Sequence, residues 1–306
     1  MGLEIGRDGA EANPDDSMKQ LSDQRVLDSY DLAADVEVTE VLSGDDFLGS
    51  GRARIEQKEG RLTVSPLTLQ VPGGTVALDF SVAPTAEKEK RLYRLDVQVK
   101  EFDYGILGRR LQPDTDLSGI LDLRTSLAGL SPDFRSLMAN ASGTINLLIR
   151  PEKQRSGVID LWAVNLFNYV TSSLTAESES KVNCFAGRFQ IHEGILHQDD
   201  LLIDTSRMQV RGDVEIDFQQ HSVNAYLRPI PKRPQFFSLG TPIRISGRFD
   251  DIGVSLPAMG IAGTVVRLAT SYIVVPIQWL ILNKLPEDGT AACLEMIEPK
   301  EADPEQ

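Results

Sequence analysis

The chain has few of the residues that usually carry chemistry. Its 306 residues include only two cysteines and three histidines, and aromatic residues make up 6% of the total. Two isolated cysteines, without CxxC spacing or a matching histidine pair, argue against a structural zinc site. The sequence contains no P-loop, no G-x-S-x-G elbow and no complete G-x-G-x-x-G. We therefore expect a protein that is not an enzyme and that holds no cofactor and no metal.

The nearest approach to a metal motif is HEGILH at residues 192–197. Its two histidines are one residue too far apart for H-E-x-x-H, and Gly194 disfavours the helix that this motif requires. A metal held by these histidines and the aspartates that follow them is the alternative. We interpret the side chains as solvent-facing turn residues.

The net charge of −14 is concentrated at the two ends of the chain. Residues 1–48 contain 13 acidic and 3 basic side chains, residues 286–306 contain 7 and 1, and the stretch between them is nearly neutral. Phosphate binding needs a clustered basic surface, so we expect no nucleic-acid partner. No basic region precedes an apolar run at the N-terminus, so we expect no signal peptide. Residues 1–25 are expected to be a flexible acidic tail and residues 286–306 a second acidic tail.

Alternating apolar and polar residues predict a mainly β fold over residues 26–285, built as an antiparallel sheet. The runs are short and are separated by Gly, Pro, Asp and Asn, with no crossover helix between most of them. A few short helices are predicted, at residues 103–111, 131–139 and 161–174. One apolar helix is predicted near the C-terminus, at residues 259–285.

Residues 51–80 and 187–218 share a pattern that indicates a weak internal repeat. Each contains a Glu-Gly corner, and "VALDF" at 76–80 matches "VEIDF" at 214–218. Stacked hairpin units explain the likeness. The alternative is that two amphipathic hairpins have converged on one general pattern.

An antiparallel sheet with one apolar face must cover that face. The predicted helices are too few to cover ten or more strands. The sheet must then close as a sandwich or barrel, or curl into a trough whose lining contacts hydrocarbon. The candidate lining residues are Val76, Leu78, Phe80, Val210, Val214, Ile216 and Phe218.

Several stretches carry a resemblance to a known family. The run "VNCFAGRFQIHEGILHQDDLLIDTSRMQVRGDVEIDFQQHSVNAYLRPIPK", the following "TPIRISGRFDDIGVSL" and the late "LPEDGTAACLEMI" resemble the C-terminal region of the AsmA family. The earlier "GRARIEQKEGRLTVSPLTLQVPGGTVALDFSV" is similar to the same family. The likeness covers residues 30–297 and rests on glycines, strand phases and the two cysteines. It implies an elongated, curled sheet and favours the trough over the sandwich.

The resemblance also implies a function and a location. It implies a Gram-negative envelope protein in the periplasm, associated with the inner membrane through an anchor helix that we expect this chain to lack. Its role would be to support outer-membrane assembly and lipid homeostasis by shielding phospholipid acyl chains in an apolar groove. Its partners would be phospholipid, a membrane surface and envelope assembly proteins. The alternative is a periplasmic scaffold for outer-membrane protein assembly, with a closed β-sandwich core and no lipid binding; a hydrolase is a third, weaker alternative.

Two features of the C-terminal part follow from a periplasmic location. Cys184 and Cys293 are expected to form a disulfide, with two buried thiols as the alternative. Sixteen uncharged residues lie between Arg267 and Lys284, with Pro276 among them. This is just short of a spanning helix, so we expect the apolar helix to cap the sheet or to lie in a membrane interface. The interface candidates are Ile273, Val274, Trp279 and Leu280.

Overall fold

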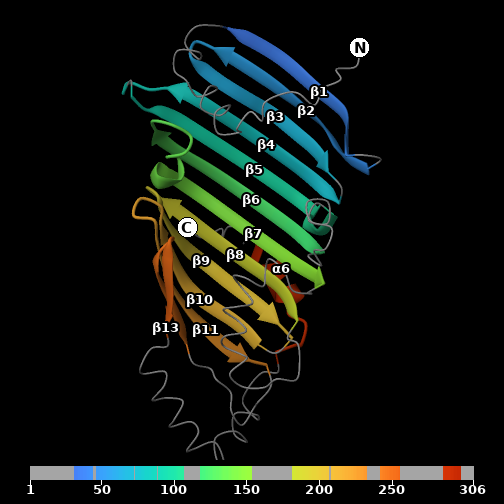
Figure 1. Cartoon of the computed structure of the whole chain (residues 1–306), viewed down its shortest axis with the longest axis vertical. Coiled ribbons are helices and arrows are strands. Elements are labelled where there is room, and N and C mark those ends of the chain that lie inside the picture. The colour runs from blue at the N-terminus through green and yellow to red at the C-terminus, as the bar shows by residue number, and fades with distance from the viewer. Residues whose placement is uncertain are drawn as a thin grey trace, which may run out of the picture.

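The computed structural model describes residues 31–43, 46–71, 73–87, 89–106, 118–153, 181–206, 208–232, 242–255 and 285–297. These residues form one large antiparallel sheet of thirteen strands with very few helices. Figure 1 shows an elongated, twisted sheet whose strands follow one another from β1 at one end of the long axis to β13 near the other. The mainly β, antiparallel architecture expected from the alternation is confirmed.

Strand order follows chain order throughout the sheet, and every pairing is antiparallel. The strands are β1 (Leu32–Ser43), β2 (Asp46–Lys58), β3 (Arg61–Val71), β4 (Gly74–Pro84), β5 (Arg91–Asp103), β6 (Ser118–Ser131), β7 (Ala141–Lys153), β8 (Val182–His192), β9 (Ile195–Thr205), β10 (Met208–Asp217), β11 (Ser222–Pro231), β12 (Ile243–Arg248) and β13 (Asp251–Ser255). Each strand therefore finds its partner in the next segment of the chain.

Two of the tightest turns share the dipeptide Glu-Gly. Glu59 and Gly60 have φ values of 51° and 71° between β2 and β3. Glu193 and Gly194 have φ values of 47° and 81° between β8 and β9. Two consecutive residues at positive φ are what a two-residue hairpin needs to match the twist of its strands, and glycine adopts this conformation at little cost.

The pairing registers align apolar residues in rows that cross the sheet. One row runs through Phe80, Leu95, Leu127, Gly143, Ile191, Leu196 and Ile216, each opposite the next on the neighbouring strand. Side chains directly opposite one another in a sheet point to the same face. The row therefore places the apolar residues of β4 and β10 on one common face, called here the apolar face.

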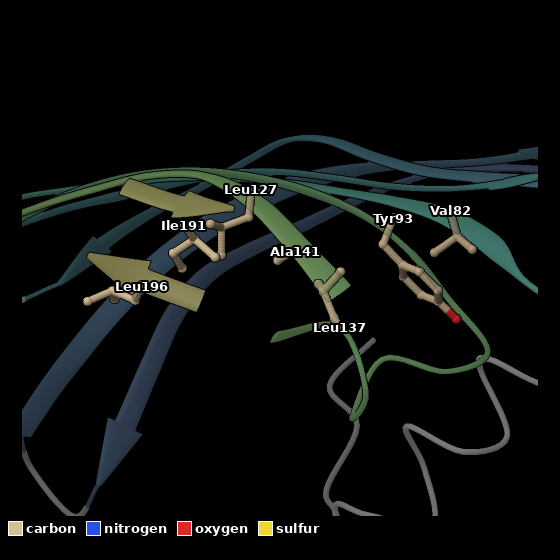
Figure 2. Packing of buried hydrophobic residues seen from close by; sticks show 7 residues of the cluster. All are labelled: Val82, Tyr93, Leu127, Leu137, Ala141, Ile191 and Leu196. Atoms are coloured by element: carbon tan, nitrogen blue, oxygen red, sulfur yellow. The ribbon is translucent and has the colours of Figure 1, made fainter. Parts of the chain in front are cut away.

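The largest group of buried residues lies on this apolar face, toward one end of the strands. Its members are Val82, Tyr93, Leu127, Leu137, Ala141, Ile191 and Leu196. Figure 2 shows these side chains on the inner side of the curved strands. The connection from β6 to β7 folds over this end, and the Phe134 ring meets the Phe80 ring edge-on at 5.7 Å.

The helix predicted at residues 131–139 is wrong. β6 continues to Ser131, and turns then lead to a single 3-10 turn, η1 (Met138–Asn140). The Ser-Pro-Asp sequence does provide local capping, since Asp133 accepts a hydrogen bond from the Ser136 amide at 2.7 Å. The segment does not continue as a helix because its apolar side chains pack on the sheet and its chain must return at once into β7.

The other predicted helices are only partly described. Residues 104–106 are helical directly after β5, at the start of the helix predicted for 103–111. The helices predicted at 161–174 and 259–285, the interface candidates and the tail at 1–25 lie outside the described residues. Within the expected acidic tail at 286–306, the structure has a helix, α6 (Thr290–Ile297), which packs on β7, β8 and β9. No helix in the described part of the chain is both long enough and apolar enough to cross a membrane.

Candidate functional site

The seven candidate lining residues come from two distant parts of the sheet and share the apolar face. Leu78 lies opposite Leu67 on β3 and Val97 on β5, and Val210 lies opposite Ile203 on β9. Phe218, which follows β10, packs in the same cluster as Phe80 and Ile216. The two groups are thus joined by continuous rows of apolar neighbours across β5 to β9.

Most of these candidates are only half-buried. Val210 is 7% exposed, whereas Val76, Leu78, Phe80, Val214, Ile216 and Phe218 have intermediate exposure. The core of a closed sandwich would remove such side chains from water. Across the described ranges the strands form a single sheet and not two sheets packed face to face. The apolar face is accordingly accessible at the half-buried candidates, whereas Leu127, Ile191 and Leu196 between the two groups are buried.

The apolar face is hollowed at its N-terminal end. A hollow of about 260 Å³ lies over β1, β2 and β3. Its lining is mostly apolar and includes Val36, Val38, Ala53, Leu67 and Leu69. Such a hollow offers contact to hydrocarbon without many polar groups that would fix its orientation.

Tyr93 belongs to the end of the apolar face that the β6–β7 connection covers. The side chain is 1% exposed, and within the described part of the chain its hydroxyl has no hydrogen-bond partner. Burial raises the pKa of Tyr93, and the nearby Asp133 carboxylate raises it further. The phenol therefore stays neutral at physiological pH and contributes apolar packing to this end of the face.

Ion pairs lie on the opposite face, called here the polar face. Three of them link neighbouring strands at 2.9–3.1 Å: Arg150 with Asp122, Arg188 with Asp200 and Arg228 with Asp213. The registers place these residues on the side away from Leu123, Leu201 and Leu227. One face is thus suited to hydrocarbon and the other to water.

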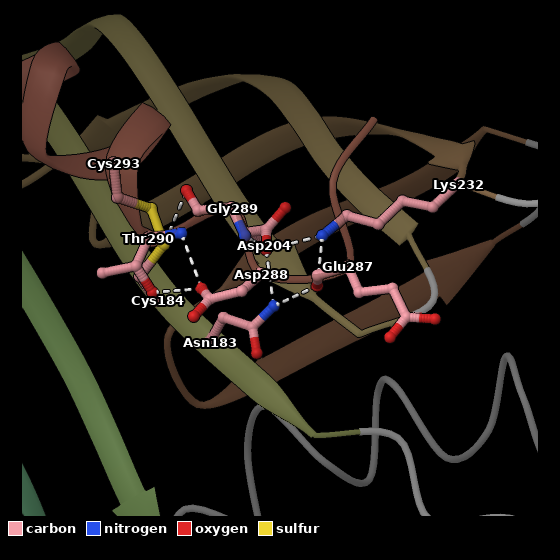
Figure 3. The surroundings of a disulfide bond; sticks show 9 residues. All are labelled: Asn183, Cys184, Asp204, Lys232, Glu287, Asp288, Gly289, Thr290 and Cys293. Atoms are coloured by element: carbon pink, nitrogen blue, oxygen red, sulfur yellow. Dashed lines mark hydrogen bonds and ion pairs between the residues drawn. A yellow bond between two sulfur atoms is a disulfide. The ribbon is translucent and has the colours of Figure 1, made fainter. Parts of the chain in front are cut away.

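α6 covers an apolar patch on the polar face. Leu148, Ala186 and Leu202 are buried there beneath Ala292, Met296 and Ile297 of the helix. Cys184 of β8 and Cys293 of α6 form a disulfide across a sequence separation of 109 residues, as Figure 3 shows. The bond fixes the C-terminal helix to the middle of the sheet.

A buried ion pair holds the segment that leads into α6. The Asp204 carboxylate accepts hydrogen bonds from Lys232 Nζ at 2.7 Å, Asn183 Nδ2 at 2.7 Å and the Gly289 amide at 2.8 Å. Lys232 Nζ also donates to the Glu287 carbonyl at 2.8 Å. Both charged side chains are almost wholly buried, and Figure 3 shows the polar groups converging. All three bonds to Asp204 end on one carboxylate oxygen, and the other oxygen is buried without a hydrogen-bond partner within the described part of the chain. The contacts tie the segment before α6 to β8 and β9 and to the end of β11, which is a structural role.

Asp204 and Lys232 are not among the site residues predicted from the sequence. A signal was present in the run Leu201-Leu202-Ile203, because consecutive apolar residues indicate a strand that is covered on both faces. A carboxylate directly after such a run is buried with it and needs a partner.

The two histidines of the HEGILH stretch are exposed, as expected, but they are not turn residues: His192 ends β8 and His197 lies on β9, and only Glu193 and Gly194 form the turn. His197 Nδ1 lies 3.5 Å from the Glu215 carboxylate across β9 and β10, and both side chains are largely exposed. Among the residues that the structure describes, no three His, Cys, Asp or Glu side chains are grouped so that they could hold a metal ion.

Comparison with known proteins gives one informative match. No family model matches the chain, and no solved structure matches it. The AsmA family protein YhjG of Escherichia coli (strain K12) is 22% identical over 240 residues, which are 76% of this chain and 34% of that protein. The chain therefore spans about a third of the length of this curated relative.

Proposed function

We propose that this chain, which is related to the AsmA family, is an envelope protein that shields phospholipid acyl chains on its apolar face. The relationship indicates an envelope protein of that family. The finer parts of the proposal are a periplasmic location beside the inner membrane and a role in outer-membrane assembly and lipid homeostasis. The disulfide supports them, because disulfides persist in oxidising compartments such as the periplasm.

One observation carries the proposal: a row of apolar residues crosses seven strands, with a side chain on every strand except at Gly143 of β7, and ends in half-exposed residues on both sides. It runs from Phe80 on β4 to Ile216 on β10. Each methylene that leaves water for such a surface gains about 0.8 kcal/mol. Binding should therefore depend on acyl length more than on headgroup, and it requires no catalytic residue. We accordingly propose a non-enzymatic role, with phospholipid, a membrane surface and envelope assembly proteins as partners.

The test measures lipid carried by the purified chain. Lipids are extracted after gentle purification and identified by mass spectrometry, for the wild type and for Leu78→Asp and Ile216→Asp. Both residues are half-buried, so a new carboxylate at either can remain hydrated in the folded protein. We expect both variants to melt close to the wild type and to lose most of the bound lipid.

Ala77→Asp is the matched control, because Ala77 neighbours Leu78 on β4 but faces the polar side. It should keep both fold and lipid. If the wild type carries no lipid and both Leu78→Asp and Ile216→Asp unfold, the result would instead favour the scaffold with a closed core. Turnover of a lipid ester that persists through purification would favour a hydrolase.

A further inference from the structure

The first strand of the sheet has an unpaired edge. Across the described ranges β1 pairs with β2 alone, and it lies at the end of the strand order. It is 12 residues long, whereas β13 at the other end has five. Proteins usually protect such edges by shortness, by proline or by lysine. β13 is short, but β1 contains no proline and no basic residue.

Part of this edge is regular enough to accept another strand. Pairing between β1 and β2 runs without a shift from Leu32 opposite Gln57 to Val38 opposite Gly51, and the bulge follows Val38. We call residues 32–38 the β1 edge segment. Its seven residues exceed the typical strand length of about 5–6, so they suffice for a backbone ladder with an added strand.

The apolar side of the β1 edge segment is incompletely covered. Val36 and Val38 are 43% and 42% exposed and line the hollow over β1, β2 and β3. In the register Val36 lies opposite Ala53, which lies opposite Leu67. An added strand with apolar residues on this side would continue the same row and cover these valines.

The polar side of the segment carries negative charge. Asp35 lies opposite Arg54 and Glu37 opposite Arg52, and all four side chains are exposed. Two basic residues on β2 thus lie opposite two acidic residues on β1. Opposite charges on directly paired strands stabilise a sheet and like charges destabilise it. A strand added beside β1 would be stabilised by basic residues on this side.

We propose that the β1 edge segment binds an extended polypeptide strand in which lysine or arginine alternates with apolar residues. A second copy paired through the same segment would set Asp35 and Glu37 against acidic residues. Residues 1–30 of this chain, with 7 acidic and 3 basic side chains, fit equally poorly by charge. A strand that alternates basic and apolar residues would pair its charges with Asp35 and Glu37 and cover Val36 and Val38. This inference does not depend on lipid binding.

Fluorescence anisotropy with three labelled decapeptides tests the proposal. The first alternates lysine and valine, the second alternates glutamate and valine, and the third has the lysines and valines of the first in two separate blocks. The block peptide controls for non-specific attraction to the net charge of −14. We expect the alternating lysine peptide to bind about tenfold more tightly than either of the others, from two favourable cross-strand pairs in place of two unfavourable ones.

Variants of the chain locate the interaction. Asp35→Asn/Glu37→Gln should fold normally, since both residues are exposed and no like charges are placed opposite Arg54 and Arg52, and should abolish the preference for the alternating lysine peptide over the glutamate peptide. Asp251→Lys on β13, at the other edge, should leave the preference unchanged. Equal binding of the alternating and block lysine peptides would overturn the proposal. The proposal would also be overturned if Asp251→Lys changed the preference among the peptides. It would be overturned as well if the chain formed a dimer that the lysine peptide does not dissociate. If the double variant fails to fold, the comparison of peptides on the wild type still decides.

Discussion

Residues 51–80 and 187–218, called here the first and second hairpin regions, have the same local design. In each, three successive strands alternate apolar and polar residues, and a Glu-Gly turn with two positive φ values joins the first strand to the second. They differ in what lies on the polar face. α6 covers Leu202 of the second region and is bonded to Cys184, three residues before that region begins, whereas Arg52 and Arg54 of the first region are exposed.

The difference teaches that alternation determines which way a side chain points but not how deeply it is buried. In the second region Leu201 and Leu202 face opposite sides and are 6% and 0% exposed. In the first region Leu67 and Leu69 remain half-buried beside the hollow. One region therefore anchors the C-terminal helix, and the other offers accessible surface.

The largest expected effect comes from breaking the buried ion pair of the second region. Asp204→Ala leaves Lys232 charged, buried and without its carboxylate, which should cost about 3–5 kcal/mol of the free energy of unfolding. Asp79→Ala is the control, because Asp79 lies on the polar face of the first region, where it is exposed and bonded only to Ser65 Oγ among the described contacts. That change should stay within about 0.5 kcal/mol. Urea unfolding measures the free energy of unfolding of both variants. Equal losses in the two variants would show that a carboxylate on the polar face is no more important to stability in the second region than in the first.

Removing the disulfide should have the next largest effect. The double variant Cys184→Ala/Cys293→Ala removes a cross-link between two positions that are 109 residues apart in the sequence. Because the unfolded chain then gains conformational freedom, the free energy of unfolding should fall by about 2–4 kcal/mol. Hydrogen exchange should quicken in α6 and in β8 to β10 while β2 to β4 keep their protection. A wild type whose unfolding midpoint does not move on adding reductant would contradict this expectation.

The two Glu-Gly turns provide a matched pair of smaller changes. Gly60→Ala must hold alanine at positive φ, which should cost about 1 kcal/mol. Gly194→Ala carries the same strain, and its Cβ would also lie 2.2 Å from the Ala139 carbonyl oxygen. We expect a cost of about 2–3 kcal/mol there. Thermal melts of the two variants show which substitution lowers the stability more. A larger loss of stability in Gly60→Ala than in Gly194→Ala would contradict our account of the turns.

The smallest effect concerns the β6–β7 connection, which contacts both regions. Hydrogen bonds from the Ser136 hydroxyl and amide lower the pKa of Asp133 below 3.8. A carboxylate with a lowered pKa stabilises the fold at higher pH, and that contribution is lost as the pH falls through its folded pKa. Asp133→Asn should therefore cost at most about 1 kcal/mol at pH 6. The difference from wild type should shrink only as the pH falls below 3.8. A difference that stays constant down to about pH 2 would mean that ionisation of Asp133 is not its cause.

Local patterns predicted the parts of this fold that depend on neighbouring residues. Alternation in runs such as 76–80 and 214–218 predicted both the strands and the face on which Leu78 and Ile216 lie. Antiparallel order followed from the short turns, because no crossover helix separates the strands.

What the sequence did not reveal depends on contacts between distant residues. Asp204 and Lys232 are paired only because the segment before α6 closes over them, and the residues that close it lie more than 80 positions after Asp204. The helix predicted at 131–139 followed its capping signal, whereas the packing of Phe134 and Leu137 on the sheet overrode it. The run Leu201-Leu202-Ile203 on β9 indicates a strand covered on both faces, but it does not indicate that the cover is α6, which begins 87 positions after Ile203.

The strict succession of strands has a consequence for how such a protein can change in length. Each strand touches little beyond the strands before and after it, so the sheet behaves as a one-dimensional array. Inserting one hairpin at a turn would separate only the two strands that the turn joins, and it would lengthen the array by about 10 Å, twice the strand spacing. Small duplications can therefore adjust the length of the sheet step by step, while all other pairings are retained.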